Sequence, residues 1–215
     1  MKIIEFKELI KHLPYKNHSL VIKKKNWNCE NQKELIDSIF NGKEIIYINR
    51  LNLFNSNKNI EEFIIKTLMW GYPTKGRGNN IENVLHKDNF EKLKNILLEY
   101  SENNISLEKL KYDLKTIKGV NISTFSKFLY FLNSTINNNR CIILDLKIIN
   151  VISNHRFDDF NDLKGITYDN AISKYEIYLN RMKEIAYTID VEIDKLELFL
   201  FIFGNNLSNV EDRNN

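Results

Sequence analysis

The chain has 215 residues, of which 43% are hydrophobic and 27% are charged, and its formal net charge is +3. These values are ordinary for a globular domain, and the 7 glycines and 2 prolines argue against a loop-dominated or low-complexity chain. So small a charge does not by itself require a nucleic-acid partner, although a protein that contacts a few phosphates needs only a local basic face. Residues 1–14 mix charged and apolar side chains, so we expect no signal peptide, and the apolar run 198–203 is too short to cross a membrane. We therefore expect a cytoplasmic protein.

The sequence has few features that are typical of a metal site or a cofactor site. Cys29 and Cys141 are far apart and form no ligand pattern, so we expect reduced thiols. The four histidines form no HExxH motif and no Cys/His pair, and neither a GxSxG nor a GxxxxGK[ST] motif is present. We expect no metal site and no cofactor.

Hydrophobic periodicity predicts a mainly helical chain with a small β element near the N-terminus. Residues 19–27 and 44–48 are typical of strands, while residues 153–165 are polar and typical of a loop. We find no internal repeat. The predicted helices cover residues 1–13, 34–40, 60–70, 81–85, 89–100, 106–117, a segment that starts at 122, 171–189 and 196–203.

A glycine-rich loop with two cations follows the predicted helix 60–70. Lys75 and Arg77 alternate with glycines there, and cations on such a flexible backbone could contact phosphates or base edges. The plain alternative is an ordinary charged loop between two helices. We favour the interpretation that the loop contacts phosphates or base edges. Trp70 and Tyr72, just before the loop, could stack on an unpaired base, although Trp70 could equally belong to the core.

Residues 114–152 are the most informative stretch. The letters LKTIKGVNISTF predict a helix, a tight turn and a second helix. Gly119 and Asn121 are residue types that accept positive φ, so we expect the chain to reverse there. Such a hairpin directs successive backbone N–H groups outward at a helix N-terminus, a geometry that can hold a phosphate. The alternative is a plain turn between two helices.

The second helix of this stretch should have an apolar and a polar side. Apolar residues recur at helical spacing and leave Ser123, Lys127 and Tyr130 opposite them. The apolar run 141–144 then leads to Asp145, which opens another helix. A lone aspartate in that place is most often an N-cap. Its carboxylate would be fixed at the helix start, where the helix dipole favours the ionised form.

The turn KGVNIST, the apolar helix after it and the segment CIILDLKII together resemble the helix-hairpin-helix superfamily of DNA glycosylases. The segments LMWGYPTKGRGNN and SKFLYFL resemble its small prokaryotic 8-oxoguanine-glycosylase-like members, which include anti-phage enzymes. The resemblance implies a mainly α, two-lobed fold. It also implies that Asp145 is the catalytic carboxylate, while Gly119, Val120 and Asn121 bind a DNA phosphate.

The sequence departs from the family pattern at several positions. Asn121 stands where the family has a second hairpin glycine, and Phe125 stands where it has a small residue. The loop 133–140 is longer than in compact members. Ser123 aligns with the lysine that forms a Schiff base in lyase-type members, and Lys127 lies one turn further along the same face. We therefore expect a monofunctional enzyme in which Lys127 is a second catalytic candidate.

The resemblance implies an enzyme that flips a base out of duplex DNA and hydrolyses its N-glycosidic bond. An ionised carboxylate beside the sugar carbon stabilises the positive charge that develops there. The base would be 8-oxoguanine-like or a modified phage base. The alternative is a non-catalytic DNA-binding subunit of a repair or anti-phage system. We expect a nucleoid-associated monomer, with one lobe made of residues 1–80 and 151–215 and the other of residues 81–150. Ser123, Lys75 and Arg77 are further candidate DNA contacts, and Trp70 and Tyr72 are candidates for the base pocket.

Overall fold

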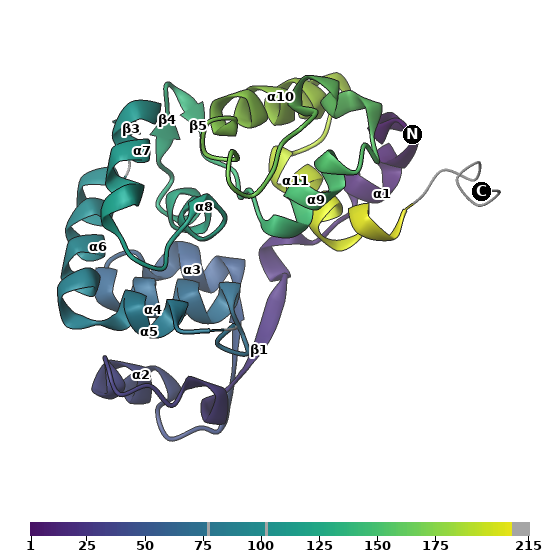
Figure 1. Ribbon diagram of the computed structural model, residues 1–215. Helices are drawn as coiled ribbons and strands as arrows, with labels where there is room; N and C mark the ends of the chain where they lie inside the picture. Colours follow the sequence, from purple (N-terminus) through teal and green to yellow (C-terminus); the bar gives the residue numbers. More distant parts are fainter. Residues whose placement is uncertain (77, 102, 208–215) are drawn as a thin grey trace.

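A computed structural model describes residues 1–76, 78–101 and 103–207, and Figure 1 shows a mainly α-helical protein with small sheets. The α-helices are α1 (Lys7–Lys11), α2 (Lys33–Phe40), α3 (Arg50–Ser56), α4 (Ile60–Gly71), α5 (Asn80–Leu85), α6 (Lys87–Tyr100), α7 (Leu107–Thr116), α8 (Ile122–Phe131), α9 (Leu146–Ser153), α10 (Tyr175–Thr188) and α11 (Ile193–Ile202). Short 3-10 helices cover Ile3–Phe6, Tyr15–Asn17, Lys24–Trp27, Asp158–Leu163 and Gly204–Asn206. The predicted fold class is confirmed.

The N-terminal β element is an antiparallel pair. Strands β1 (Ser19–Lys23) and β2 (Ile45–Asn49) face each other with Val21 opposite Tyr47. The strand-like stretch is shorter than predicted, because the chain turns into a 3-10 helix at Lys24. A second sheet, which the sequence did not predict, has the order β3 (Asn104–Ile105), β4 (Thr135–Ile136) and β5 (Asn139–Arg140).

Local signals placed several helix ends correctly. The side chain of Asn59 accepts a hydrogen bond from the Glu62 N–H at the start of α4, and Ser106 caps α7 in the same way. Other expectations were wrong in detail. The predicted loop 153–165 contains the 3-10 helix Asp158–Leu163. Helix α10 begins at Tyr175 instead of residue 171, and α3 was not predicted at all.

Helix α8 lies at the centre of the molecule (Figure 1). It packs against α3, α4 and α6, and each of its ten residues is buried. The predicted polar side therefore does not face solvent. Ser123 and Lys127 are only 6% and 4% exposed, because the segment that leads into α9 covers that side.

The remaining helices gather in two groups on either side of α8. Helices α9 and α10 both pack on α11, and α1 from the chain start packs on α11 as well. Helices α3 and α4 instead contact each other and α8. The proposed division into lobes, 1–80 with 151–215 and 81–150, stays a prediction.

Candidate active site

The turn between α7 and α8 is a tight hairpin that only glycine fits. Gly119 has φ +86°, and a Cβ added there would lie 2.6 Å from the carbonyl oxygen of Asn80. The side chain of Asn89 holds the turn from outside, because it donates to the carbonyl of Lys118 and accepts from its N–H. The predicted reversal at Gly119 is therefore confirmed, and α5 packs directly against it.

Asn121 has a different part in the hairpin from the one predicted. Its φ is −125°, which is extended backbone, so the expectation of a left-handed residue was wrong. Asn121 is the N-cap of α8, and its side chain accepts from the Thr124 N–H at 3.1 Å. Within the described part of the chain, no group accepts from the N–H of Gly119, Val120 or Asn121. These N–H groups remain available to an external anion.

The carboxylate of Asp145 joins the start of α9 to Lys127 of α8. One carboxylate oxygen accepts from the Lys147 N–H at 3.0 Å, which makes Asp145 the N-cap of α9. The other lies 2.7 Å from Nζ of Lys127, which also donates to the Ser123 carbonyl at 2.7 Å. The two side chains are 17% and 5% exposed, so the pair is largely withdrawn from water.

The electrostatics of the pair keep Asp145 ionised. Burial alone would raise the pKa of this carboxyl, but the Lys127 ammonium and the Lys147 N–H outweigh burial, so that the pKa lies below its ordinary value. A carboxylate in such surroundings carries a full negative charge at neutral pH. It can therefore stabilise a positive charge that develops nearby.

The segment before Asp145 is fixed by side chains from two helices. The hydroxyls of Tyr175 and Tyr178 on α10 donate to the carbonyls of Ile142 and Ile143 at 2.9 and 2.8 Å. From α8, Ser126 accepts the Leu144 N–H at 3.0 Å. All of these groups are buried. The position of the carboxylate is thus set by rigid elements on both sides of the chain.

Gly71 makes room for Lys127. A Cβ at this last residue of α4 would lie 3.1 Å from Cδ of Lys127. The sequence suggested only that glycine ends this helix, and the contact across the helices was missed. A small residue at the end of α4 allows the lysine to pass to Asp145.

A cavity of about 450 Å³ opens beside this pair, and its volume is within the usual range for small-molecule sites. The cavity lies between the hairpin, the end of α4, α5 and the start of α9. It brings together six of the predicted site residues: Tyr72, Lys75, Gly119, Asn121, Ser123 and Asp145.

Tyr72 and Lys75 take defined positions in the wall of the cavity. The hydroxyl of Tyr72 hydrogen-bonds the hydroxyl of Thr124 at 2.5 Å, and its ring lies beside Gly76. Lys75 pairs with Glu82 of α5 at 2.5 Å. Tyr72 thus offers a fixed aromatic face, whereas the charge of Lys75 is partly neutralised.

Trp70 is not among the residues that line this cavity. Trp70 is 3% exposed, packs edge-on against Phe131 and lies 5.4 Å from the guanidinium of Arg50, so it belongs to the core. The physical reason is that Trp70 points inward from α4 toward α8. Arg77 lies outside the described residues.

Sequence reasoning missed three polar residues of the cavity. Lys147 and Asn150 follow Asp145 on the first turns of α9, and Tyr168 comes from the segment before α10. For the first two, helical spacing after Asp145 was an available signal. For Tyr168 none was, since its place depends on the tertiary fold.

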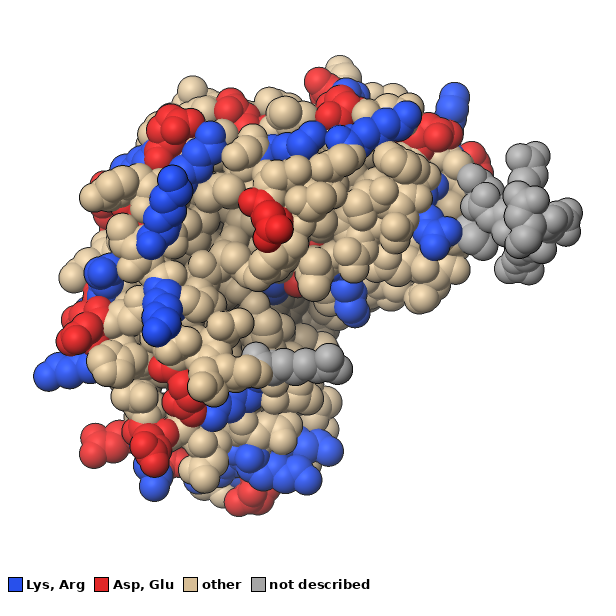
Figure 2. Space-filling model, viewed as in Figure 1, with Lys and Arg blue, Asp and Glu red and all other residues tan. Residues whose placement is uncertain are grey.

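Lysines lie near the hairpin. Figure 2 shows Lys and Arg side chains on this side of the molecule with Asp and Glu side chains among them. Lys111 and Lys115 of α7 line a groove that shares Asn121 and Tyr168 with the cavity. Lys111 pairs with Glu108, whereas Lys115 forms no ion pair among the described residues.

No cluster of three or more potential metal ligands occurs among the residues that the structure describes. Within the same residues, no helix is long and apolar enough to cross a membrane.

The hairpin, the buried helix after it and the carboxylate at the start of α9 follow one another as in the helix-hairpin-helix glycosylases that the sequence resembles. The chain belongs to the family described as "Putative 8-oxoguanine DNA glycosylase OGG-like protein", which matches residues 14–201. The family membership implies DNA binding and confirms the resemblance. Comparisons with curated proteins and with solved structures gave no match.

Proposed function

We propose that this protein is a DNA N-glycosylase that hydrolyses the bond between a damaged or modified base and its sugar. The observation that carries the proposal is the Asp145–Lys127 pair at 2.7 Å, fixed beside a cavity and downstream of an open hairpin. The family membership supports the same activity. Duplex DNA is the partner, and an abasic site is the product.

In the proposed reaction the target nucleotide leaves the base stack and enters the cavity, which costs about a few kcal/mol of stacking and pairing energy. The N–H groups of Gly119, Val120 and Asn121 bind a phosphate of the same strand. As the bond from C1′ to the base nitrogen breaks, positive charge grows on the sugar, and the ionised Asp145 stabilises it. The base leaves with the electron pair of the broken bond, water adds its oxygen to C1′, and the proton that this water releases ends on the departing base.

Lys127 supports Asp145 in this proposal and does not attack the sugar. Lys127 is not among the residues that line the cavity, and its Nζ is turned toward the Asp145 carboxylate and the Ser123 carbonyl, away from the place where a sugar would lie. The enzyme is then monofunctional. Borohydride trapping of a covalent adduct between the protein and its DNA would contradict this assignment.

The substrate is an 8-oxoguanine-like base or a modified phage base. Tyr72 and Tyr168 offer aromatic surfaces for stacking in the cavity, and Lys147 and Asn150 offer polar groups to the base edge. Duplexes that contain 8-oxoguanine, uracil, alkylated bases or a mismatch, together with modified phage DNA, would be tested for alkali-labile abasic sites.

The decisive variant is Asp145→Asn, because asparagine keeps the capping oxygen and loses the charge. We expect base release to fall by about 100- to 1,000-fold, with duplex binding retained. Equal rates for the variant and the wild type would refute the role of the carboxylate.

The open N–H groups of the hairpin would serve a non-catalytic DNA-binding subunit equally well. That second candidate predicts salt-dependent duplex binding, no base release from any substrate and no effect of Asp145→Asn.

A further inference from the structure

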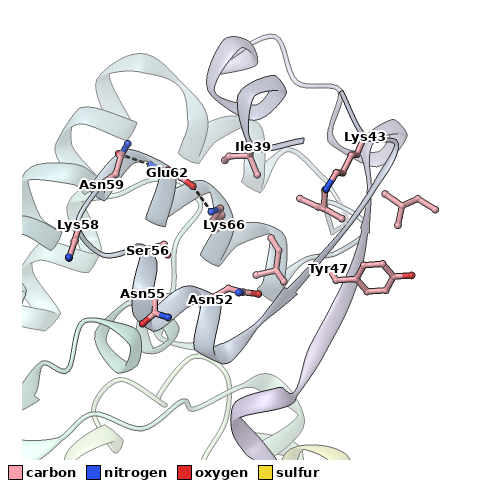
Figure 3. A pocket seen from close by; sticks show the side chains of 13 residues that line it. Ile39, Lys43, Tyr47, Asn52, Asn55, Ser56, Lys58, Asn59, Glu62 and Lys66 are labelled. Atoms are coloured by element: carbon pink, nitrogen blue, oxygen red, sulfur yellow. Dashed lines mark hydrogen bonds and ion pairs between the residues drawn. The ribbon is translucent and has the colours of Figure 1, made fainter. Parts of the chain in front are cut away.

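A second cavity, of about 770 Å³, lies between strand β2 and helices α3 and α4 (Figure 3). It shares no residue with the candidate active site. Its walls are Ile39, Lys43, the four residues 45–48, Asn52, Asn55, Ser56, Lys58, Asn59, Glu62 and Lys66.

The cavity runs along the free edge of β2. Side chains alternate between the two faces of a strand, so a cavity lined by four consecutive residues, 45–48, must follow an edge of that strand. No residue of β1 lines it. The edge in question is therefore the one opposite β1, and in the described chain no other strand pairs with β2.

The backbone of this edge has unused hydrogen-bonding groups. In an antiparallel pair, facing residues alternate between bonded and non-bonded positions. The Lys24 N–H donates to the Glu44 carbonyl at 2.9 Å, so Ile45 and Tyr47 come at the non-bonded positions and direct their N–H and C=O groups outward. The next outward N–H, that of Asn49, is taken by Asn52 at 3.0 Å. No such partner is present for Ile45 or Tyr47 among the described residues.

The groove is apolar at its base and basic at its rim. Ile39 and Ile46 are half-buried in it. Lys43 and Lys58 form no ion pair in the described structure, while Lys66 pairs with Glu62. The labelled side chains of Figure 3 show the lysines distributed around the opening, and Tyr47 points away from α3 and α4. The lysine excess favours an occupant with carboxylates.

We propose that the free edge of β2 binds an extended, acidic segment of a partner protein as an added strand. The outward N–H and C=O groups of Ile45 and Tyr47 would pair with its backbone, and Lys43 and Lys58 would pair with its carboxylates. A second copy of this chain fits less well, because pairing through the same edge would bring a second set of lysines to one groove. The docked protein would leave the glycosylase cavity open.

The test uses the full chain and a fluorescein-labelled peptide of about six residues in which valine and glutamate alternate. We expect saturable binding below about 1 mM by fluorescence anisotropy. Two control peptides separate the contribution of backbone pairing from that of the carboxylates. One carries an N-methyl group on every backbone amide, which removes the N–H donors of both strand edges and so prevents strand addition, and the other has lysine in place of glutamate. Neither control should bind.

A matched pair of protein variants tests the edge itself. Tyr47→Pro removes an outward N–H at a position where an edge strand tolerates proline, and Tyr47→Thr removes the ring but keeps the N–H. We expect Tyr47→Pro to weaken binding about tenfold relative to Tyr47→Thr. Lys43→Glu, a surface change outside the strand, should weaken binding and remove most of its salt dependence. Circular dichroism checks that each variant is folded.

Several results would overturn the proposal. These are no binding at the highest peptide concentration, equal binding of the N-methylated or lysine peptide, and equal affinities of the two Tyr47 variants. Dimerisation of the chain that Tyr47→Pro abolishes would assign the edge to a second copy instead. Displacement of the peptide by duplex DNA would assign the groove to DNA.

Discussion

Replacing Lys127 with glutamine tests how the protein keeps Asp145 charged. The variant carries no positive charge, and its side chain is one atom shorter than the lysine that makes the 2.7 Å contact. Asp145, whose side chain is 17% exposed, would then lie largely buried without a counter-charge. Burial already acts to raise the pKa of this carboxyl, and the Lys127 ammonium is the first of the groups that lower it. We therefore expect both stability and catalysis to suffer.

The expected loss in the free energy of unfolding can be estimated from the geometry of the ion pair. Removing one partner of a buried ion pair costs about 3–5 kcal/mol. Because Asp145 keeps the Lys147 N–H at 3.0 Å and some contact with water, we expect a loss near the lower end, about 3 kcal/mol at neutral pH. The pKa of Asp145 is lowered in the folded protein, so the pair stabilises it fully above about pH 4. This contribution disappears as the pH falls through the lowered pKa of Asp145. The wild type and Lys127→Gln should then have similar free energies of unfolding.

Urea unfolding of the wild type and Lys127→Gln at neutral and acidic pH measures the predicted difference. Lys147→Gln is the control for the unfolding experiment alone, since it removes an exposed lysine close to the same carboxylate but also changes the lining of the cavity. Base release should be slower in Lys127→Gln. The acidic limb of the curve of its base-release rate against pH should move to higher pH. Equal unfolding midpoints and an unchanged pH profile would refute the reasoning. Borohydride trapping that Lys127→Gln abolishes would instead make Lys127 the nucleophile.

Three further substitutions test the surroundings of the site. Gly119→Ala should destabilise the protein by more than about 1 kcal/mol and weaken duplex binding. The reason is that φ is +86° and the new Cβ would lie 2.6 Å from the Asn80 carbonyl oxygen. Duplex binding equal to that of the wild type would contradict this prediction. Gly71→Ala should slow base release with little loss of thermal stability, because the new methyl group lies 3.1 Å from Cδ of Lys127 while alanine favours the helix; an unchanged rate would argue against this contact. Tyr178→Phe should cost about 1–3 kcal/mol in urea unfolding, because it leaves a buried carbonyl unpaired, and an unchanged midpoint would show that this bond is dispensable.

The parts of the site that the sequence predicted depend on local rules. Gly119 was found because a tight reversal requires positive φ, and the structure has it. The place of Asp145 at a helix start follows from the change between an apolar run and a helical pattern. Asn121 shows the limit of this reasoning, since asparagine suits both a left-handed position and an N-cap. Composition could not decide between them.

The parts that could not be predicted depend on contacts between distant segments. The burial of Lys127 results from α8 being covered on every side, whereas helical periodicity suggested one open side. Trp70 lies in the core because of its contacts with Arg50 and Phe131, which come from other elements. Tyr168 reaches the cavity from a segment with no regular pattern. In each case the decisive partner lies far away in the sequence.

The two interpretations of Asp145, helix cap and catalytic carboxylate, are compatible because each uses a different oxygen. Oδ1 accepts the Lys147 N–H and fixes the side chain at the start of α9, while Oδ2 faces Lys127. The cap restricts the rotation of the carboxylate, so the oxygen that would meet the developing charge is oriented before substrate binds. For the same reason, asparagine at this position should preserve the cap while it removes the charge. It also leaves the buried Lys127 without its counter-charge, so the variant should be less stable than the wild type, as Lys127→Gln is. The capping role and the proposed catalytic role of Asp145 can thus be separated by a single substitution.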